Sequence, residues 1–143
     1  MTAIKARVQT TPTLGQWAVV GAIAAIAAAV AVLIVQAIAI ALWPEVALFK
    51  PLDSYPRTVL FTIIPTFIAT GLFAWLAMRQ ATPERTFLRI AAIVLLLSFL
   101  PDYLLPVANR TFLASSVAAF MHVIAAAVIV TILVAGYRRF SRR

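Results

Sequence analysis

The chain has 143 residues, of which 64% are hydrophobic and 11% are charged. Soluble chains average about 45–50% apolar and about 25% charged residues, so most of this protein must be surrounded by lipid. The absence of cysteine excludes thiol catalysis, disulfide bonds and cysteine-ligated metal sites. The net charge of +8 would suggest a nucleic-acid partner in a soluble chain, but we expect none here, because the sequence has neither a reader module nor a long basic tail.

The first long apolar stretch runs from about Trp17 to Trp43. Crossing the hydrocarbon core of a bilayer takes about 20 helical residues, so this stretch can span a membrane. Lys5 and Arg7 precede it, as in a cleaved signal peptide, but the apolar region of a signal peptide covers only about 7–15 residues. We therefore expect an uncleaved first span. Small residues at i, i+4 and i+8 predict its helix-packing face: Gly21, Ala25 and Ala29.

The second span is expected from about Arg57 to Met78, after a loop with three prolines in residues 44–56. The Asp-Ser-Tyr-Pro run at 53–56 is typical of a helix cap. Threonines at helical spacing form a polar ridge on this span: Thr62, Thr66 and Thr70. Such hydroxyls can bond to the carbonyl four residues earlier, so the ridge alone favours a structural role.

The third and fourth spans are expected at about Phe87–Leu105 and Phe112–Tyr137. A short turn precedes the third span, and its Thr-Pro-Glu run at 82–84 predicts an N-cap followed by proline at the first helical position. With no internal repeat or linker, we expect residues 1–143 to form a single domain. The predicted fold is an all-α membrane protein, an antiparallel four-helix transmembrane bundle.

Basic residues are unevenly divided between the two sides of these four spans. Nine lie on the side of both termini: Lys5, Arg7, Arg79, Arg85, Arg89, Arg138, Arg139, Arg142 and Arg143. Three lie on the other side: Lys50, Arg57 and Arg110. Because cytoplasmic loops carry the excess of basic residues, we expect both termini to be cytoplasmic in a multi-pass protein of a bacterial cytoplasmic membrane. All three tryptophans and all three tyrosines fall near predicted span ends, which is typical of an interfacial belt.

His122, the only histidine, is expected roughly 15 Å along the fourth helix at about 1.5 Å per residue. An ionisable side chain at this depth is a candidate functional group, and an interhelical hydrogen bond is the structural alternative. Asp102 is expected near the outer interface, paired with Arg57 or Arg110. The hypothesis is an outward-opening polar pocket for a small ligand, a lipid headgroup or a proton path. It would be formed by Gln36, Arg57, Thr62, Thr66, Ser98, Asp102, Ser115 and His122.

A basic cluster at the end of the fourth span predicts contact with anionic lipid. Its members are Arg138, Arg139, Arg142 and Arg143. No Gly-rich phosphate loop, HExxH, GxSxG or pair of intramembrane carboxylates is present, so we predict no catalytic residue and no metal site.

Three segments resemble a bacterial family of small uncharacterised four-span membrane proteins, defined only as a domain of unknown function. They are Arg-Thr-Phe at 85–87, Leu-Ser-Phe-Leu-Pro-Asp at 97–102 and Phe-Met-His-Val-Ile-Ala-Ala-Ala at 120–127. The resemblance extends from Arg57 to about Ile132, and the first span matches only in character. It implies a stand-alone four-helix protein with no known activity, whose family pattern includes Ser98, Asp102 and His122.

Three functional classes follow from these observations. The first is a non-catalytic accessory subunit or a small-ligand or lipid-binding helical bundle, in contact with the lipid bilayer and working as a homo-oligomer or within a larger membrane complex. The second is a small proton-coupled transporter. The third is a protein that binds a cofactor, haem or a pigment, through His122. The sequence does not indicate which cofactor or ligand is bound.

Overall fold

The computed structural model describes residues 11–141. It contains four long helices: α1 (Leu14–Leu42), α2 (Tyr55–Arg79), α3 (Pro83–Leu104) and α4 (Phe112–Ser141). Two short 3-10 helices, η1 (Pro44–Leu48) and η2 (Lys50–Leu52), join α1 to α2. The described residues include no strand, and all four long helices have the length and hydropathy to cross a membrane. The prediction of an all-helical protein with four membrane spans is therefore confirmed.

Helices α1 and α2 begin after residues whose side chains satisfy free backbone N–H groups. At the start of α1, the Thr13 hydroxyl accepts from Gln16 N at 3.3 Å, and Gln16 Oε1 accepts from Thr13 N at 2.8 Å, which is a capping box. At the start of α2, the Ser54 hydroxyl accepts from Arg57 N at 3.5 Å, as the sequence predicts. Thr82 occupies the cap position of α3, but its side chain makes no capping hydrogen bond.

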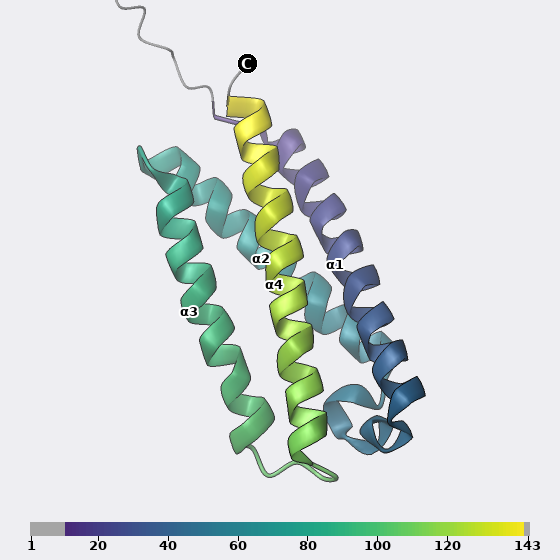
Figure 1. The fold of residues 1–143 in the computed structure, drawn as a ribbon. Helices are drawn as coiled ribbons and strands as arrows, with labels where there is room; N and C mark the ends of the chain where they lie inside the picture. The colour runs from purple at the N-terminus through teal and green to yellow at the C-terminus, as the bar shows by residue number, and fades with distance from the viewer. Residues whose placement is uncertain (1–10, 142–143) are drawn as a thin grey trace, which may run out of the picture.

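The four helices run in alternating directions and pack in the cyclic order α1, α2, α3, α4 (Figure 1). The contact between α1 and α4 is the most extensive, and α3 packs mainly on α4. The start of α1, the α2–α3 turn and the end of α4 lie together at one end of the bundle, here called the terminal end. The opposite end, with η1, η2 and the α3–α4 loop, is called the loop end.

Close approach of α1 to its neighbours depends on glycine. A Cβ atom at Gly21 would lie 2.9 Å from Thr70 Cγ2 on α2, and one at Gly136 would lie 2.7 Å from Val20 Cγ1 on α1. Neither position has room for a side chain, so the backbone at each glycine packs directly against a side chain of the neighbouring helix. The predicted packing face of α1 is buried throughout: Gly21, Ala25 and Ala29.

Four aromatic rings, one from each helix, fill the terminal end. Phe73 is fully buried and stacks on Phe87 with ring centroids 4.3 Å apart, while Trp17 and Tyr137 contact it at 5.3 and 5.2 Å. Trp17 lies near the start of α1, at the end of a span as predicted, but its ring packs inward and is 6% exposed. Trp17 and Tyr137 also stack on each other with ring centroids 6.1 Å apart, within the distance at which aromatic contacts are favourable.

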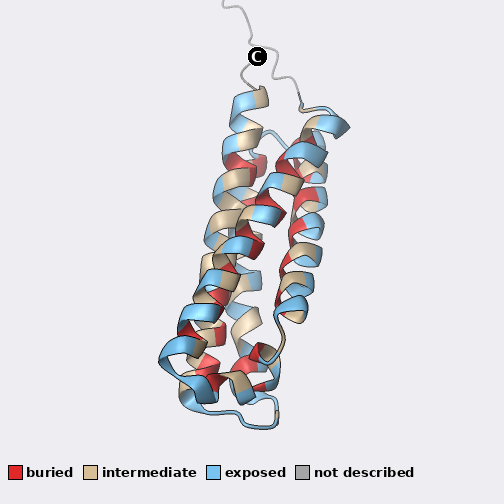
Figure 2. Ribbon diagram, turned by 90° about the vertical axis from the view of Figure 1, so that its right-hand side faces the viewer, coloured by how far each residue is buried: buried red, intermediate tan, exposed pale blue. Residues whose placement is uncertain are grey.

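Exposed residues line the outward sides of the helices (Figure 2), and many of them are large and apolar. This pattern is strongest on α3, in which only Pro83, Phe87 and Asp102 are buried. Exposing so many leucine, isoleucine and valine side chains to water would cost free energy, whereas contact with lipid acyl chains does not. The fold therefore places these side chains in contact with a lipid bilayer. Asp102 is an exception on α3, because it is the one charged residue of this helix that is buried.

Candidate functional site

Asp102 on α3 and His122 on α4 meet in the loop-end half of the bundle. Asp102 Oδ2 lies 3.3 Å from His122 Nε2. The aspartate side chain is 7% exposed, whereas the histidine side chain is 44% exposed. The imidazole therefore covers the carboxylate and remains accessible itself.

The directions of helical side chains explain why these two residues can meet. Asp102 belongs to the last turn of α3, and helical side chains point back toward the N-terminus of their helix. Its carboxylate is thus directed away from the loop, toward the depth of His122, which is roughly 15 Å along α4 from Phe112. Ser115 fixes the backbone of the same turn, because its hydroxyl donates to Asp102 O at 2.6 Å.

The carboxylate is not fully satisfied by these contacts. Oδ2 is buried and has no hydrogen-bond donor among the described residues, since the His122 ring is close but is not aligned for a hydrogen bond. Leaving a buried polar group without a partner costs about 1–3 kcal/mol, and a charged group costs more.

The structure brings together four of the predicted site residues. Asp102 contacts two of them: its carboxylate lies beside His122, and its backbone oxygen accepts from Ser115. Ser98 is partly buried one turn before Asp102 on α3, and its hydroxyl donates to Leu95 O at 2.7 Å. This serine can still accept a hydrogen bond, because a hydroxyl oxygen has two lone pairs.

Gln36 and the threonines donate their hydrogen bonds elsewhere, although Gln36 Oε1 is buried without a partner among the described residues. Gln36 is 1% exposed and its Nε2 donates to Leu52 O at 2.9 Å, so it ties η2 to α1. Thr62 donates to Thr58 O at 2.8 Å and Thr66 donates to Thr62 O at 2.7 Å, each four residues back along α2. These contacts fit the structural role of the threonine ridge, because each hydroxyl hydrogen is already used within α2.

The expected ion pairs of Asp102 with arginine are wrong. Arg57 instead pairs with Asp53, one helical turn earlier, and also donates to Lys50 O. Arg110 donates to Tyr103 O, a free carbonyl at the end of α3. The physical reason is proximity along the chain, because each guanidinium finds an acceptor within seven residues.

The basic cluster of α4 is also partly engaged within the protein. Arg138 Nε donates to Glu84 Oε2 at 2.9 Å, and a second nitrogen of the same guanidinium donates at 2.5 Å. This contact joins α4 to the start of α3, so part of the Arg138 charge is used within the protein. Arg139 is exposed, and the other two predicted lipid contacts, Arg142 and Arg143, lie outside the described residues.

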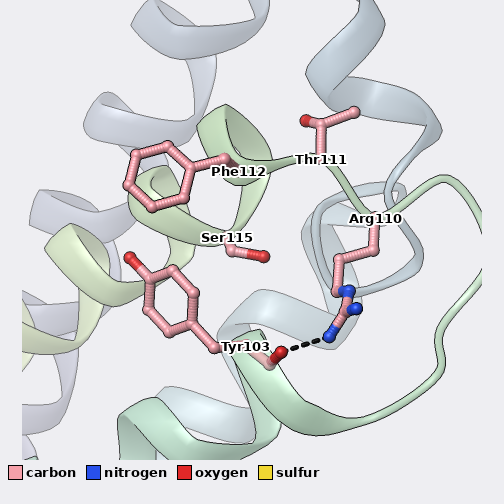
Figure 3. Close-up of a pocket in the computed structure, with 5 residues that line it drawn as sticks. All are labelled: Tyr103, Arg110, Thr111, Phe112 and Ser115. Carbon is pink, nitrogen blue, oxygen red and sulfur yellow. Dashed lines mark hydrogen bonds between the residues drawn. The ribbon is translucent and has the colours of Figure 1, made fainter.

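A cavity of about 250 Å³ at the loop end was not predicted (Figure 3). It lies between the end of α3 and the start of α4 and is lined by Tyr103, Arg110, Thr111, Phe112 and Ser115. In Figure 3 the Arg110 side chain and the Ser115 hydroxyl approach the same space. The available sequence signal was Arg110, two residues before the first residue of α4, but its approach to the end of α3 depends on how the two helices pack.

Comparisons with known proteins give a family and no precedent for the site. No curated protein and no solved structure matches the chain. The sequence profile of a family of unknown function, DUF6069, matches residues 11–139. This match includes the first span, which the three resembling segments did not cover, and it contains every described residue of the Asp102–His122 region. The chain therefore belongs to the family of unknown function DUF6069.

Proposed function

We propose that this protein is a non-catalytic membrane protein that binds a small lipid-soluble molecule with a polar group at the Asp102–His122 pair. The observation that carries the proposal is the unequal exposure of the pair: the histidine side chain is 44% exposed and the aspartate side chain 7%. An imidazole on the surface of a membrane-spanning helix meets acyl chains rather than water. Leaving its polar nitrogen in hydrocarbon costs free energy, and a ligand with a hydrogen-bonding group would remove that cost.

The pair supplies one oriented contact for such a ligand. The Asp102 carboxylate lies against the Nε2 edge of the ring and limits the orientation of the ring by contact. Asp102 faces Nε2, so Nδ1 of His122 is the ring nitrogen left for a ligand. Because Asp102 Oδ2 itself is buried, it acts by positioning His122 rather than by touching the ligand.

The transporter class receives less support from the geometry. A proton path across the membrane needs polar groups at successive depths, and the threonine hydroxyls of α2 donate within their own helix. The terminal half of the described core is apolar and is filled by the aromatic rings around Phe73. Binding at one depth fits this arrangement better than passage through it.

The cofactor class makes a specific demand on the same pair. Haem or pigment ligation through His122 would have to use Nδ1, since Nε2 faces the carboxylate. A visible absorption spectrum of the purified protein tests this class directly. A colourless preparation from the native source would remove it.

The orientation and assembly of the protein complete the proposal. The terminal end faces the cytoplasm of a bacterial cytoplasmic membrane, because nine of the twelve basic residues of the chain belong to that side of the four spans. Residues 1–143 act as one domain. The protein serves as an accessory component, as a homo-oligomer or within a larger membrane complex, and presents the bound molecule from its α3–α4 face.

The test is purification of the full chain in mild detergent from its native membrane, with mass spectrometry of the small molecules that accompany it. The proposal predicts a molecule that is retained by the wild type and depleted from His122→Gln and Asp102→Asn. Thr131→Val on the exposed face of α4 is the matched control and should retain it. Identical small-molecule content in all four proteins, with equal thermal stability, would refute the proposal.

A further inference from the structure

We propose that the loop-end cavity binds the phosphate group of an anionic phospholipid, with Arg110 as its main contact. The cavity has a volume of about 250 Å³ and lies between the last turn of α3 and the first turn of α4 (Figure 3). This proposal is separate from the Asp102–His122 pair and does not depend on it. The cavity is smaller than the roughly 300–1,000 Å³ typical of sites for whole drug-sized ligands, so it suits one group of a larger molecule.

Two hydroxyls of the cavity have already used their hydrogen atoms. Ser115 donates to Asp102 O at 2.6 Å. Tyr103 and Ser116 share a hydrogen bond of 3.1 Å, and Ser116 donates its own hydrogen to Phe112 O at 2.8 Å. Tyr103 must therefore be the donor of the shared bond, because a hydroxyl has one hydrogen. Neither group is a free donor toward a ligand.

The donors that remain in the cavity belong to Arg110 and Thr111. Arg110 uses one N–H on Tyr103 O, and its guanidinium has several further N–H groups. Thr111 caps α4 by accepting from Ala114 N at 3.1 Å, so its own O–H is still free to donate. A cavity whose remaining donors are a guanidinium and a hydroxyl is suited to a multivalent oxygen anion such as phosphate.

Arg110 also lacks an acidic partner in the described part of the chain. The ion pairs there engage Asp53, Asp102 and Glu84 with other residues. Arg57, at the same end of the bundle, is held by Asp53. Lys50 and Arg110 are then the loop-end cations outside the ion pairs of the described residues, and Arg110 is the one that lines the cavity. Pairing with an external anion would supply what the protein itself does not.

The surroundings of the cavity favour a lipid over a free ion. The cavity lies at the ends of two membrane-spanning helices, the level at which phospholipid headgroups are found. Phe112 is 82% exposed beside it, and Leu104 and Leu105 on the α3 side are 68% and 52% exposed. Acyl chains of the same molecule could pack on these side chains while the phosphate enters the cavity.

The experiment is native mass spectrometry of the delipidated full chain, titrated with phosphatidylglycerol, with phosphatidylcholine or with inorganic phosphate. Arg110→Gln is expected to weaken phosphatidylglycerol binding about five- to tenfold, given the strength of a charge-assisted contact near a membrane surface. Arg57→Gln is the matched control at the same end, and it should leave binding unchanged because that guanidinium is occupied by Asp53. Equal weakening in both variants, or none in Arg110→Gln, overturns the proposal.

A second variant keeps the test decisive if loss of the Tyr103 contact unfolds Arg110→Gln. Thr111→Asp retains a good N-cap and places a favourable negative charge at a helix start, so it should fold. Its carboxylate would occupy the anion position and is expected to lower phosphatidylglycerol binding by a similar factor. Full binding by Thr111→Asp overturns the proposal. Tight binding of inorganic phosphate that excludes the lipid would assign the cavity to a free anion instead.

Discussion

The two ends of the bundle satisfy their side chains in opposite ways. At the terminal end, Phe73 is completely buried among aromatic rings from the other three helices. At the loop end, α3 and α4 meet through polar groups, and several of these can make further hydrogen bonds, among them the half-exposed ring of His122 and the guanidinium of Arg110. The core of the terminal end leaves no group for a partner to bind, whereas the loop end still has groups that can bind one.

This difference separates stability from binding along one molecule. Apolar contacts in the centre of the terminal end stabilise the fold and offer nothing to a ligand. The polar groups of the loop end contribute less to stability, since Asp102 Oδ2 lacks a hydrogen-bond donor among the described residues. Substitutions in the aromatic cluster should therefore act mainly on unfolding, and substitutions of the polar groups between α3 and α4 should act mainly on what the protein carries.

The largest effect is expected from Phe73→Ala. Deleting a fully buried ring that contacts three other rings should lower the free energy of unfolding by about 3–5 kcal/mol, because lost burial and a cavity both count. Unfolding of the detergent-solubilised protein, by heat or by titration with SDS, measures it. Phe67→Ala, on the same helix but 49% exposed, is the control and should have a much smaller effect. Equal losses would mean that the terminal end is no more tightly packed than the surface.

A somewhat smaller loss is expected from Gly136→Ala. The added Cβ would lie 2.7 Å from two methyl carbons of Val20, so α4 must move away from α1, at a cost of about 1–3 kcal/mol. Gly71→Ala is the matched control, since no atom lies within 4 Å of the Cβ position there. That control should be neutral or stabilising, because alanine is the better helix former. A stable Gly136→Ala protein would show that the α1–α4 contact is loose.

Local signals in the sequence predicted the elements well. Apolar length defines a membrane-spanning helix, and cap residues such as Thr82 and Ser54 mark helix starts within the chain itself. The prediction that α1 packs through small residues was also local, since Gly21 and Ala25 share a face by spacing alone. These features depend on neighbours a few residues away and not on how helices rotate against one another.

The partners within the candidate site depend on that rotation and were predicted poorly. Asp102 and His122 were placed at one end of the bundle, but the sequence offered no way to see that the ring of His122 covers the carboxylate. Arg57 was assigned to Asp102, although an acidic residue four positions earlier is the simpler partner by helical spacing. Likewise Trp17 fits an interfacial belt by position, and only packing shows that its ring turns inward.

A double-mutant cycle on Asp102 and His122 sharpens the comparison at the loop end. His122→Ala alone leaves a buried carboxylate uncovered, so it should destabilise the protein more than His122→Ala made in an Asp102→Asn background. The expected coupling is about 1 kcal/mol, measured by unfolding of the four proteins. Strict additivity would mean that the 3.3 Å approach is incidental and would weaken the proposed positioning role of Asp102.

The smallest effect on stability is expected from Glu84→Gln, which removes the exposed ion pair of the terminal end. The pair with Arg138 is solvent-accessible, so Tm should fall only slightly at low salt. The difference should vanish in 1 M salt, where the screening length is about 3 Å. The released guanidinium should instead increase retention of anionic phospholipid, counted by native mass spectrometry. Glu45→Gln at the loop end is the control, because it changes the net charge equally and Glu45 forms no ion pair among the described residues. An equal gain of lipid in both variants would attribute the lipid to net charge and not to Arg138.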